Sequence, residues 1–200
     1  AVVLVATARA LKYHGGVPLK DINRPNFEAI TDGIANLEKH IENMNKFKIC
    51  PVVAINRFAS DTDEEVDFIR KFCESMRVPV SIVDVWGKGG EGALELADMV
   101  ARIATSCNSK YKPLYDWSWP PEQKIETIAK RIYGANAVEY TSKAKQDLLK
   151  VKDLGMDRSP VCMAKTQKSL SDNPSLLGRP KDFVVKIREM EVATGANFII

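Results

Sequence analysis

Polar side chains and paired glycines follow the first apolar segment of the chain. Residues 1–6 form an uninterrupted apolar run, and the next ten residues include a hydroxyl, an imidazole, two cations and two adjacent glycines, at Thr7, Arg9, Lys12, His14, Gly15 and Gly16. Cations form charge-assisted hydrogen bonds with anions, and glycine permits positive φ and a close approach to the backbone. The segment is a candidate edge of a ligand site, although a βα turn with two solvated cations has the same spacing.

Two aromatic residues form a second candidate site. Phe58 follows the apolar segment 50–56, and Trp86 follows the next one, 78–85. If these segments are neighbouring parallel strands, both rings lie at the carboxyl edge of one sheet, where ligands of such sheets bind. Two rings there form a slot for a flat ligand, with stacking worth about 1 kcal/mol beyond area burial. Taken singly, each ring is more often a loop anchor packed on a neighbouring helix.

The glycine-rich segment 87–92 satisfies the pattern G-x-G-x-x-G formally. A dinucleotide site also needs a second strand that ends in an acid about 20 residues further on, and residues 109–113 have no strand pattern. A Walker A loop is excluded as well, because Lys88 is followed by glycine and not by Ser or Thr. A glycine-rich βα turn remains as the plain alternative to a ligand loop.

The elements that position these residues alternate between strands and helices. Apolar residues from Phe27 to Met44 recur at steps of three and four, which predicts a helix of about 20 residues. Thr62 and Glu65 have the spacing of a capping box, and the helix that they begin is expected to end near Met76. Another helix is expected over 91–105. Short connections between strand, helix and strand predict an α/β fold with a doubly wound, mostly parallel sheet.

The second half of the chain is less regular. Residues 106–121 form a polar and aromatic connector. Pro120 and Pro121 are expected to begin a helix that reaches Tyr133, and Thr141 to cap a helix that reaches Leu154. Strands are expected over 161–164, 183–187 and 197–200.

Composition excludes several classes of protein. The 200 residues carry a net charge of +3, with 45% hydrophobic and 28% charged residues, as in an ordinary globular chain. No block of like charge indicates a nucleic-acid arm, and no apolar run approaches the roughly 20 residues of a membrane helix. The four cysteines, at positions 50, 73, 107 and 162, include no C-x-x-C pair. We therefore expect reduced, mostly buried thiols and no metal site.

Several motifs together resemble one enzyme family. Residues 5–16 are similar to the V-A-T-[IV]-R-A-L-K-x-[HN]-G-G signature of formate tetrahydrofolate ligases, with Ala8 in place of the usual Ile or Val. Four further motifs follow in the same order and spacing as in that family: Asn56-x-Phe58-x-x-Asp61-Thr62, residues 86–92 (Trp-x-Lys-Gly-Gly-Glu-Gly), residues 132–135 (Ile-Tyr-Gly-Ala), and the segment 163–171 with Lys165 and Thr166. The resemblance extends over essentially all 200 residues.

The resemblance implies an ATP-dependent ligase that formylates tetrahydrofolate through formyl phosphate, giving 10-formyltetrahydrofolate, ADP and phosphate. It implies ATP with Mg²⁺, a monovalent cation, small-molecule substrates and a homo-oligomer. The short apolar runs make a cytoplasmic location the default expectation. In the family, the residues that match Phe58 and Trp86 sandwich the folate, and we place Asn56, Lys88, Gly89 and Gly90 around them. We place the motif at 7–16, with Lys165 and Thr166, near the active cleft, and assign no catalytic residue.

The resemblance also predicts a domain division. Residues 1–45 would end a nucleotide-binding α/β domain of the P-loop NTPase type, and residues 46–200 would belong to an incomplete Rossmann-like folate-side domain. Because the chain begins and ends within apolar strands and has no Gly-x-Gly-Lys-[Ser/Thr] loop, we expect an internal fragment, truncated at both ends and inactive alone. The alternative is a non-catalytic folate-binding or scaffold module.

Overall fold

The structure, a computed structural model, describes all residues except Lys165 and Gln167, and it forms two compact units. The first unit contains residues 1–112 and 177–179, and the second contains residues 113–176 and 180–200. The predicted boundary at 45/46 lies within the first unit, because the strands on either side of it are direct neighbours in one sheet. The two compact units divide after residue 112.

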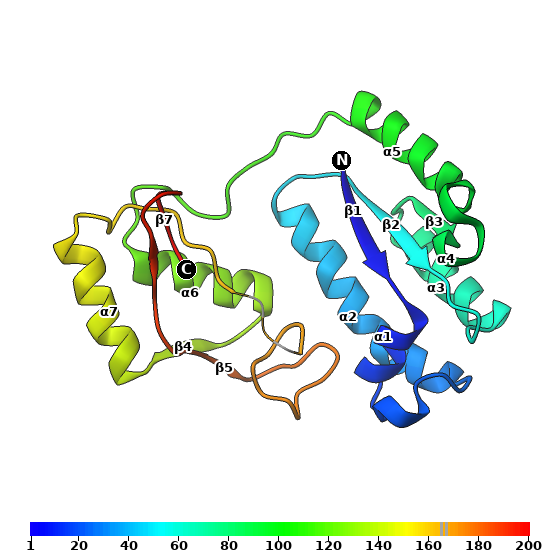
Figure 1. The fold of residues 1–200 in the computed structure, drawn as a ribbon, viewed down its shortest axis with the longest axis horizontal. Helices are drawn as coiled ribbons and strands as arrows, with labels where there is room; N and C mark the ends of the chain where they lie inside the picture. The colour runs from blue at the N-terminus through cyan, green and yellow to red at the C-terminus, as the bar shows by residue number, and fades with distance from the viewer. Residues whose placement is uncertain (165, 167) are drawn as a thin grey trace. The chain divides into compact units, whose positions relative to one another are not determined.

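A parallel three-stranded sheet organises the first unit (Figure 1). Its order is β1 (Val2–Ala6), β2 (Pro51–Asn56) and β3 (Val80–Val83). Ala6 pairs with Ile55, and Asn56 pairs with Val83, so the three strands end at the same edge. The parallel α/β arrangement expected from the sequence is confirmed, and the residues after each strand meet at its carboxyl edge.

Helices cover both faces of this sheet. Leu4, Val53 and Val80 share one face and pack in the core with residues of α2 (Phe27–Lys46) and α3 (Asp63–Ser75). Side chains alternate along a strand, so Ser81 points to the other face, where its hydroxyl donates to Glu95 of α5 (Leu94–Ser106) at 3.0 Å. Helices on opposite faces make the sheet doubly wound, as predicted.

A short helix that the sequence analysis treated as a turn follows β1. Helix α1 (Ala8–His14) begins at Thr7, whose hydroxyl accepts the N–H of Ala10. It packs against α2 with almost no space between the backbones: a Cβ on Gly15 would lie 1.9 Å from the carbonyl oxygen of Ala29. A one-turn 3₁₀ helix, η1 (Leu19–Asp21), follows. Close packing therefore requires glycine at position 15.

The sequence analysis predicted a capping box before α3 and a glycine-rich loop after β3. The capping box is confirmed, since Thr62 Oγ1 accepts the N–H of Glu65 at 3.2 Å and Glu65 Oε2 accepts the N–H of Thr62 at 3.1 Å. The prediction of an irregular glycine-rich loop is wrong. The residues after β3 form a helical turn, α4 (Val85–Lys88), and a 3₁₀ helix, η2 (Gly89–Ala93). Trp86 therefore lies in the first turn of a helix and not at a strand end.

The second unit combines helices with short strands. Its elements are α6 (Pro121–Ile128), the π-helical turn η3 (Ala129–Tyr133), β4 (Ala137–Tyr140), α7 (Ser142–Asp153), β5 (Val184–Ile187), β6 (Val192–Ala193) and β7 (Phe198–Ile199). β4 and β5 pair in parallel, and β6 and β7 pair antiparallel. Pro121 begins α6 and Thr141 caps α7, as predicted. In place of the strand predicted at 161–164, the described residues form one bridge between Val161 and Ile199.

The prediction of four reduced thiols is wrong. A disulfide joins Cys50 to Cys107, whose Cα atoms are 6.6 Å apart, within the range that such a bond requires. Their separation of 57 residues gives no sign of the pairing, which arises because the fold brings the two segments together. Cys73 is free and buried, and Cys162 is free and exposed.

None of the helices in the described part of the chain combines the length and the apolar character needed to cross a bilayer.

Candidate functional site

A tight turn after β2 fixes the position of Phe58. The N–H of Phe58 donates to Asp61 Oδ2 at 2.9 Å, and the N–H of Asp61 returns to the carbonyl of Phe58 at 3.0 Å. The N–H of Arg57 continues the sheet by donating to Val83 at 3.0 Å. Both strand ends are thereby joined just before the turn, and Phe58 is half-buried at the carboxyl edge of the sheet.

The guanidinium of Arg9 lies over the Phe58 ring. Its central carbon is 3.9 Å from the ring centroid, and Nη2 donates to Ser60 Oγ at 3.4 Å. A cation over an aromatic face is attracted by the ring quadrupole. Among the described residues, Arg9 Nε and Asp61 Oδ1 are buried without a hydrogen-bond partner. Arg9 therefore supports the ring, and both residues in contact with Phe58 retain unsatisfied polar atoms.

Asp84 organises the segment that carries Trp86. Its N–H donates to Gly92 at 3.1 Å, its carbonyl accepts from Lys88 at 3.0 Å, and its carboxylate accepts from Gly87 at 3.0 Å. Trp86 projects from this closed turn with 93% of its surface exposed. The side chain with the largest apolar surface in the turn is thus held in water.

The glycines of this turn have different roles. Gly89 has a φ of +58°, which favours glycine, and a Cβ on Gly92 would lie 2.1 Å from the carbonyl oxygen of Asp84. At Gly90 a Cβ would meet no atom within 4 Å. The fold therefore requires glycine at positions 89 and 92. It does not require glycine at position 90, where the backbone is open to solvent.

Lys12 forms a buried ion pair. Its ammonium lies 3.3 Å from Glu65 Oε1 and donates to the carbonyl of Arg24 at 3.1 Å, and both charged side chains are almost fully buried. Glu65 also accepts the N–H of Asn26 at 2.8 Å. Burial would raise the pKa of the Glu65 carboxyl, but two backbone N–H groups and the Lys12 ammonium hold its pKa below the ordinary value of 4.5. The predicted anion ligand Lys12 instead joins α1 to α3.

Other residues of the motif at 7–16 also stabilise the fold. Thr7 caps α1, and His14 Nδ1 accepts the N–H of Gly178 at 3.1 Å. Gly16 has a φ of +95°. A cavity of about 450 Å³ does border the glycine pair, and its lining is of mixed charge: Gly15, Gly16, Val17, Pro18, Asp21, Arg24, Pro25, Asn26, Glu28, Ala29 and Asp32. The motif thus reaches a cavity, but through its glycines and not through Lys12.

Thr166, another predicted cleft residue, belongs to the second unit. Thr166 Oγ1 donates to the carbonyl of Ser169 at 2.8 Å, as in a loop cap. Lys165 lies outside the described residues.

No group of three or more His, Cys, Asp or Glu side chains within the described ranges is placed to hold a metal ion.

Sequence reasoning missed two organising carboxylates. Asp84 directly precedes a short apolar and glycine segment, and Asp in that position is a common helix N-cap, so a local signal existed. The pairing of Glu65 with Lys12 had no local signal, because the two residues are far apart in the chain and Glu65 was already explained by its capping box.

A comparison with protein families gives a match. The family model described as formate–tetrahydrofolate ligase matches residues 1–200, the entire chain. The exposed Trp86 and the Phe58 ring, which lies under the Arg9 guanidinium, follow neighbouring strands of the parallel sheet in this chain. Both residues lie in motifs on which the sequence resemblance rests. The chain belongs to the formate–tetrahydrofolate ligase family.

Proposed function

We propose that the protein carrying this chain joins formate to tetrahydrofolate at the expense of ATP. The products are 10-formyltetrahydrofolate, ADP and phosphate, with formyl phosphate as the intermediate. The family assignment supports the reaction class. The proposal includes formate, ATP and tetrahydrofolate as the ligands, a monovalent cation, and a cytoplasmic homo-oligomer.

The observation that carries the folate assignment is the exposure of Trp86 at the same sheet edge as Phe58. Water-exposed tryptophan is costly in apolar area, and an aromatic ligand that stacks on it recovers that cost. We propose that the pterin ring binds between Trp86 and Phe58, with Asn56, Lys88, Gly89 and Gly90 around it. The facing planes would then be about 7 Å apart, which is the sum of two stacking distances.

Arg9 has a specific place in this proposal. Its guanidinium occupies one side of the Phe58 ring, so the folate would use the other side. A cation behind an aromatic ring draws electron density toward itself and fixes the plane of the ring. Arg9 would therefore orient the stacking surface and would not bind the folate directly.

The described residues offer no acidic cluster that fits Mg²⁺. In this proposal Mg²⁺ is held by the phosphates of bound ATP and not by side chains of this chain. Lys12 is likewise assigned no phosphate, because Glu65 neutralises it inside the core.

The test is the substitution Trp86→Ala in the protein that carries this chain. Loss of a stacking aromatic should weaken tetrahydrofolate binding by about 1–3 kcal/mol and leave ATP binding nearly unchanged. Trp117→Ala is the matched control, because Trp117 is also exposed but lies in the second unit. Isothermal titration with each ligand gives both affinities, and equal losses for ATP and folate would contradict the proposal.

A formylation assay separates the two candidate functions. Turnover of formate, ATP and tetrahydrofolate by the protein carrying this chain supports the ligase, and the 200 residues alone are expected to give none. Folate binding without turnover in the protein carrying this chain would favour the non-catalytic module instead.

A further inference from the structure

The Cys50–Cys107 pair opens onto a cavity at the end of the sheet opposite to Phe58. The cavity has a volume of about 360 Å³, and the residues that line it come from the beginnings of β2 and β3 and the ends of α2, α3 and α5: Asn45, Ile49, Cys50, Pro51, Met76, Arg77, Val78, Pro79, Ile103 and Cys107. Both cysteines are half-buried. The two cysteines therefore lie on the wall of a space large enough for a small reactant.

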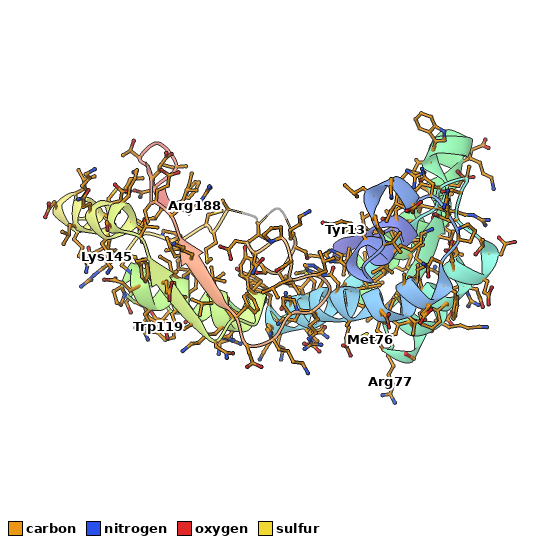
Figure 2. All side chains as sticks on the ribbon, turned by 90° about the horizontal axis from the view of Figure 1, so that it is seen from below. Tyr13, Met76, Arg77, Trp119, Lys145 and Arg188 are labelled. Carbon is orange, nitrogen blue, oxygen red and sulfur yellow. A yellow bond between two sulfur atoms is a disulfide. The ribbon has the colours of Figure 1, made fainter. Side chains whose placement is uncertain are left out.

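The charge of this cavity is positive. Arg77 is its charged lining residue, and none of the lining residues is acidic. The Arg77 side chain is exposed and extends away from the end of α3, as Figure 2 shows. A cation at the rim attracts an anionic reactant and raises its local concentration.

Non-covalent contacts would hold the two cysteines near each other without the bond. Ser109 Oγ donates to the carbonyl of Lys48 at 3.0 Å, and the N–H of Lys112 donates to the carbonyl of Phe47 at 3.1 Å. Tyr111 stacks on Phe47 with ring centroids 6.3 Å apart. Because these contacts align segment 108–112 with segment 47–48, a reduced pair stays in position to be oxidised again.

The disulfide is also the strongest hold on the end of α5. None of the residues of α5 is buried, and Cys107 directly follows its last turn. Reduction would leave that end attached through half-buried side chains and the contacts of the following segment.

We propose that Cys50 and Cys107 form a reversible thiol–disulfide exchange site for an anionic low-molecular-weight thiol, such as a carboxylate-bearing thiol peptide. In the reductive direction, the thiolate of the small molecule attacks one sulfur of the protein disulfide, giving a mixed disulfide and a protein thiolate. A second small thiolate attacks the mixed disulfide, so the protein gains two thiols and the small molecule leaves as its own disulfide. Oxidation reverses both steps. This site is independent of folate binding.

Glutathione is the probe for the test, because it carries a net negative charge and a thiol. The protein is equilibrated with mixtures of reduced and oxidised glutathione, acid-quenched, alkylated and mapped by mass spectrometry without reduction. We expect a Cys50–Cys107 cross-linked peptide in oxidising mixtures and alkylated Cys50 and Cys107 peptides in reducing ones, whereas the exposed thiol of Cys162 is free to react in both. In Cys107→Ser, Cys50 should carry glutathione. Cys73 is the internal control. It is buried, and burial raises its pKa to about 12, so it should carry no glutathione.

Charge reversal at Arg77 tests the anionic class of reactant. Arg77→Glu should slow reduction by glutathione about threefold to tenfold and slow reduction by 2-mercaptoethanol less, because the glutathione thiolate carries one more negative charge. Arg188→Glu, an exposed arginine of the second unit, is the matched control and should change neither rate. Absence of the cross-linked peptide at every glutathione ratio would overturn the site, and equal slowing with both thiols would overturn the role of Arg77.

Discussion

The segments Thr7–Gly16 and Asp84–Gly92 both combine glycines with charged residues after a β-strand, but the fold uses them differently. In the first segment, Lys12 is neutralised in the core, and Gly15 is required by the approach of α1 to α2. In the second segment, backbone groups form hydrogen bonds with Asp84, and the Trp86 side chain is almost fully exposed. Residue types that suggest ligand binding can therefore belong to the core, and burial distinguishes the two cases.

The largest effect is expected from adding one methyl group at Gly15. Because a Cβ there would overlap the carbonyl oxygen of Ala29 at 1.9 Å, Gly15→Ala should lower the free energy of unfolding by about 4 kcal/mol or more. Gly195→Ala is the control, since a Cβ at Gly195 meets no atom within 4 Å. Chemical denaturation followed by circular dichroism measures both variants. Equal stability of Gly15→Ala and Gly195→Ala would show that the helices do not pack this closely.

Loss of the Lys12 ammonium should be nearly as severe. Lys12→Met leaves Glu65 buried without its cation and should cost about 3–5 kcal/mol at neutral pH. The pKa of Glu65 is lower in the folded protein than in the unfolded one, so its contribution is fully present above about pH 4.5 and is lost as the pH falls through the folded value. The gap between wild type and Lys12→Met should therefore narrow in acid.

The double variant Lys12→Met/Glu65→Gln controls for the buried charge. It should recover at least about half of the loss at neutral pH, because removing both charges leaves no unpaired ion in the core. A Lys12→Met protein with normal stability and weakened nucleotide affinity would instead return Lys12 to the active cleft.

Arg9 joins the first segment to the turn that carries Phe58 and should show an intermediate effect. Arg9→Met removes the cation from the face of Phe58 and keeps an apolar side chain of similar length, so tetrahydrofolate affinity should fall by about 0.5–1.5 kcal/mol. Arg9→Lys should recover part of that loss. Titration with tetrahydrofolate measures the effect, and unchanged affinity in Arg9→Met would remove Arg9 from the site.

The smallest change in stability is expected at Gly90. Since a Cβ there meets nothing within 4 Å, Gly90→Ala should change the free energy of unfolding by less than about 0.5 kcal/mol. If folate lies against this backbone, the added methyl should still weaken binding. Denaturation and titration of the same variant measure its stability and its folate affinity separately. A large loss of stability would show that Gly90, like Gly15, is required by the packing of the fold.

Local signals in the sequence predict much of the first unit. The apolar period of α2 and the capping box of α3 depend on residues a few positions apart, so both helices were identified. Helix α1 was missed because its seven residues are too few to show a clear period. Its stability comes from packing at Gly15 and Gly33, which depends on residues distant in sequence.

The sequence was enough to select the two aromatic residues of the candidate site, but not to predict which side chains contact them. Phe58 and Trp86 were identified because each follows an apolar strand. The placement of Arg9 over Phe58, the pairing of Lys12 with Glu65 and the disulfide all join segments that only the tertiary fold brings together. Spacing along the chain carries no information on such contacts.

Hydrogen exchange with and without tetrahydrofolate tests the contrast between the two segments most directly. Exchange measured by mass spectrometry on the protein that carries this chain reports protection in each segment separately. We expect folate to slow exchange in residues 57–62 and 85–93 and to leave residues 10–16 unchanged. Protection of residues 10–16 without protection of residues 85–93 would contradict the assignment of folate binding to Phe58 and Trp86.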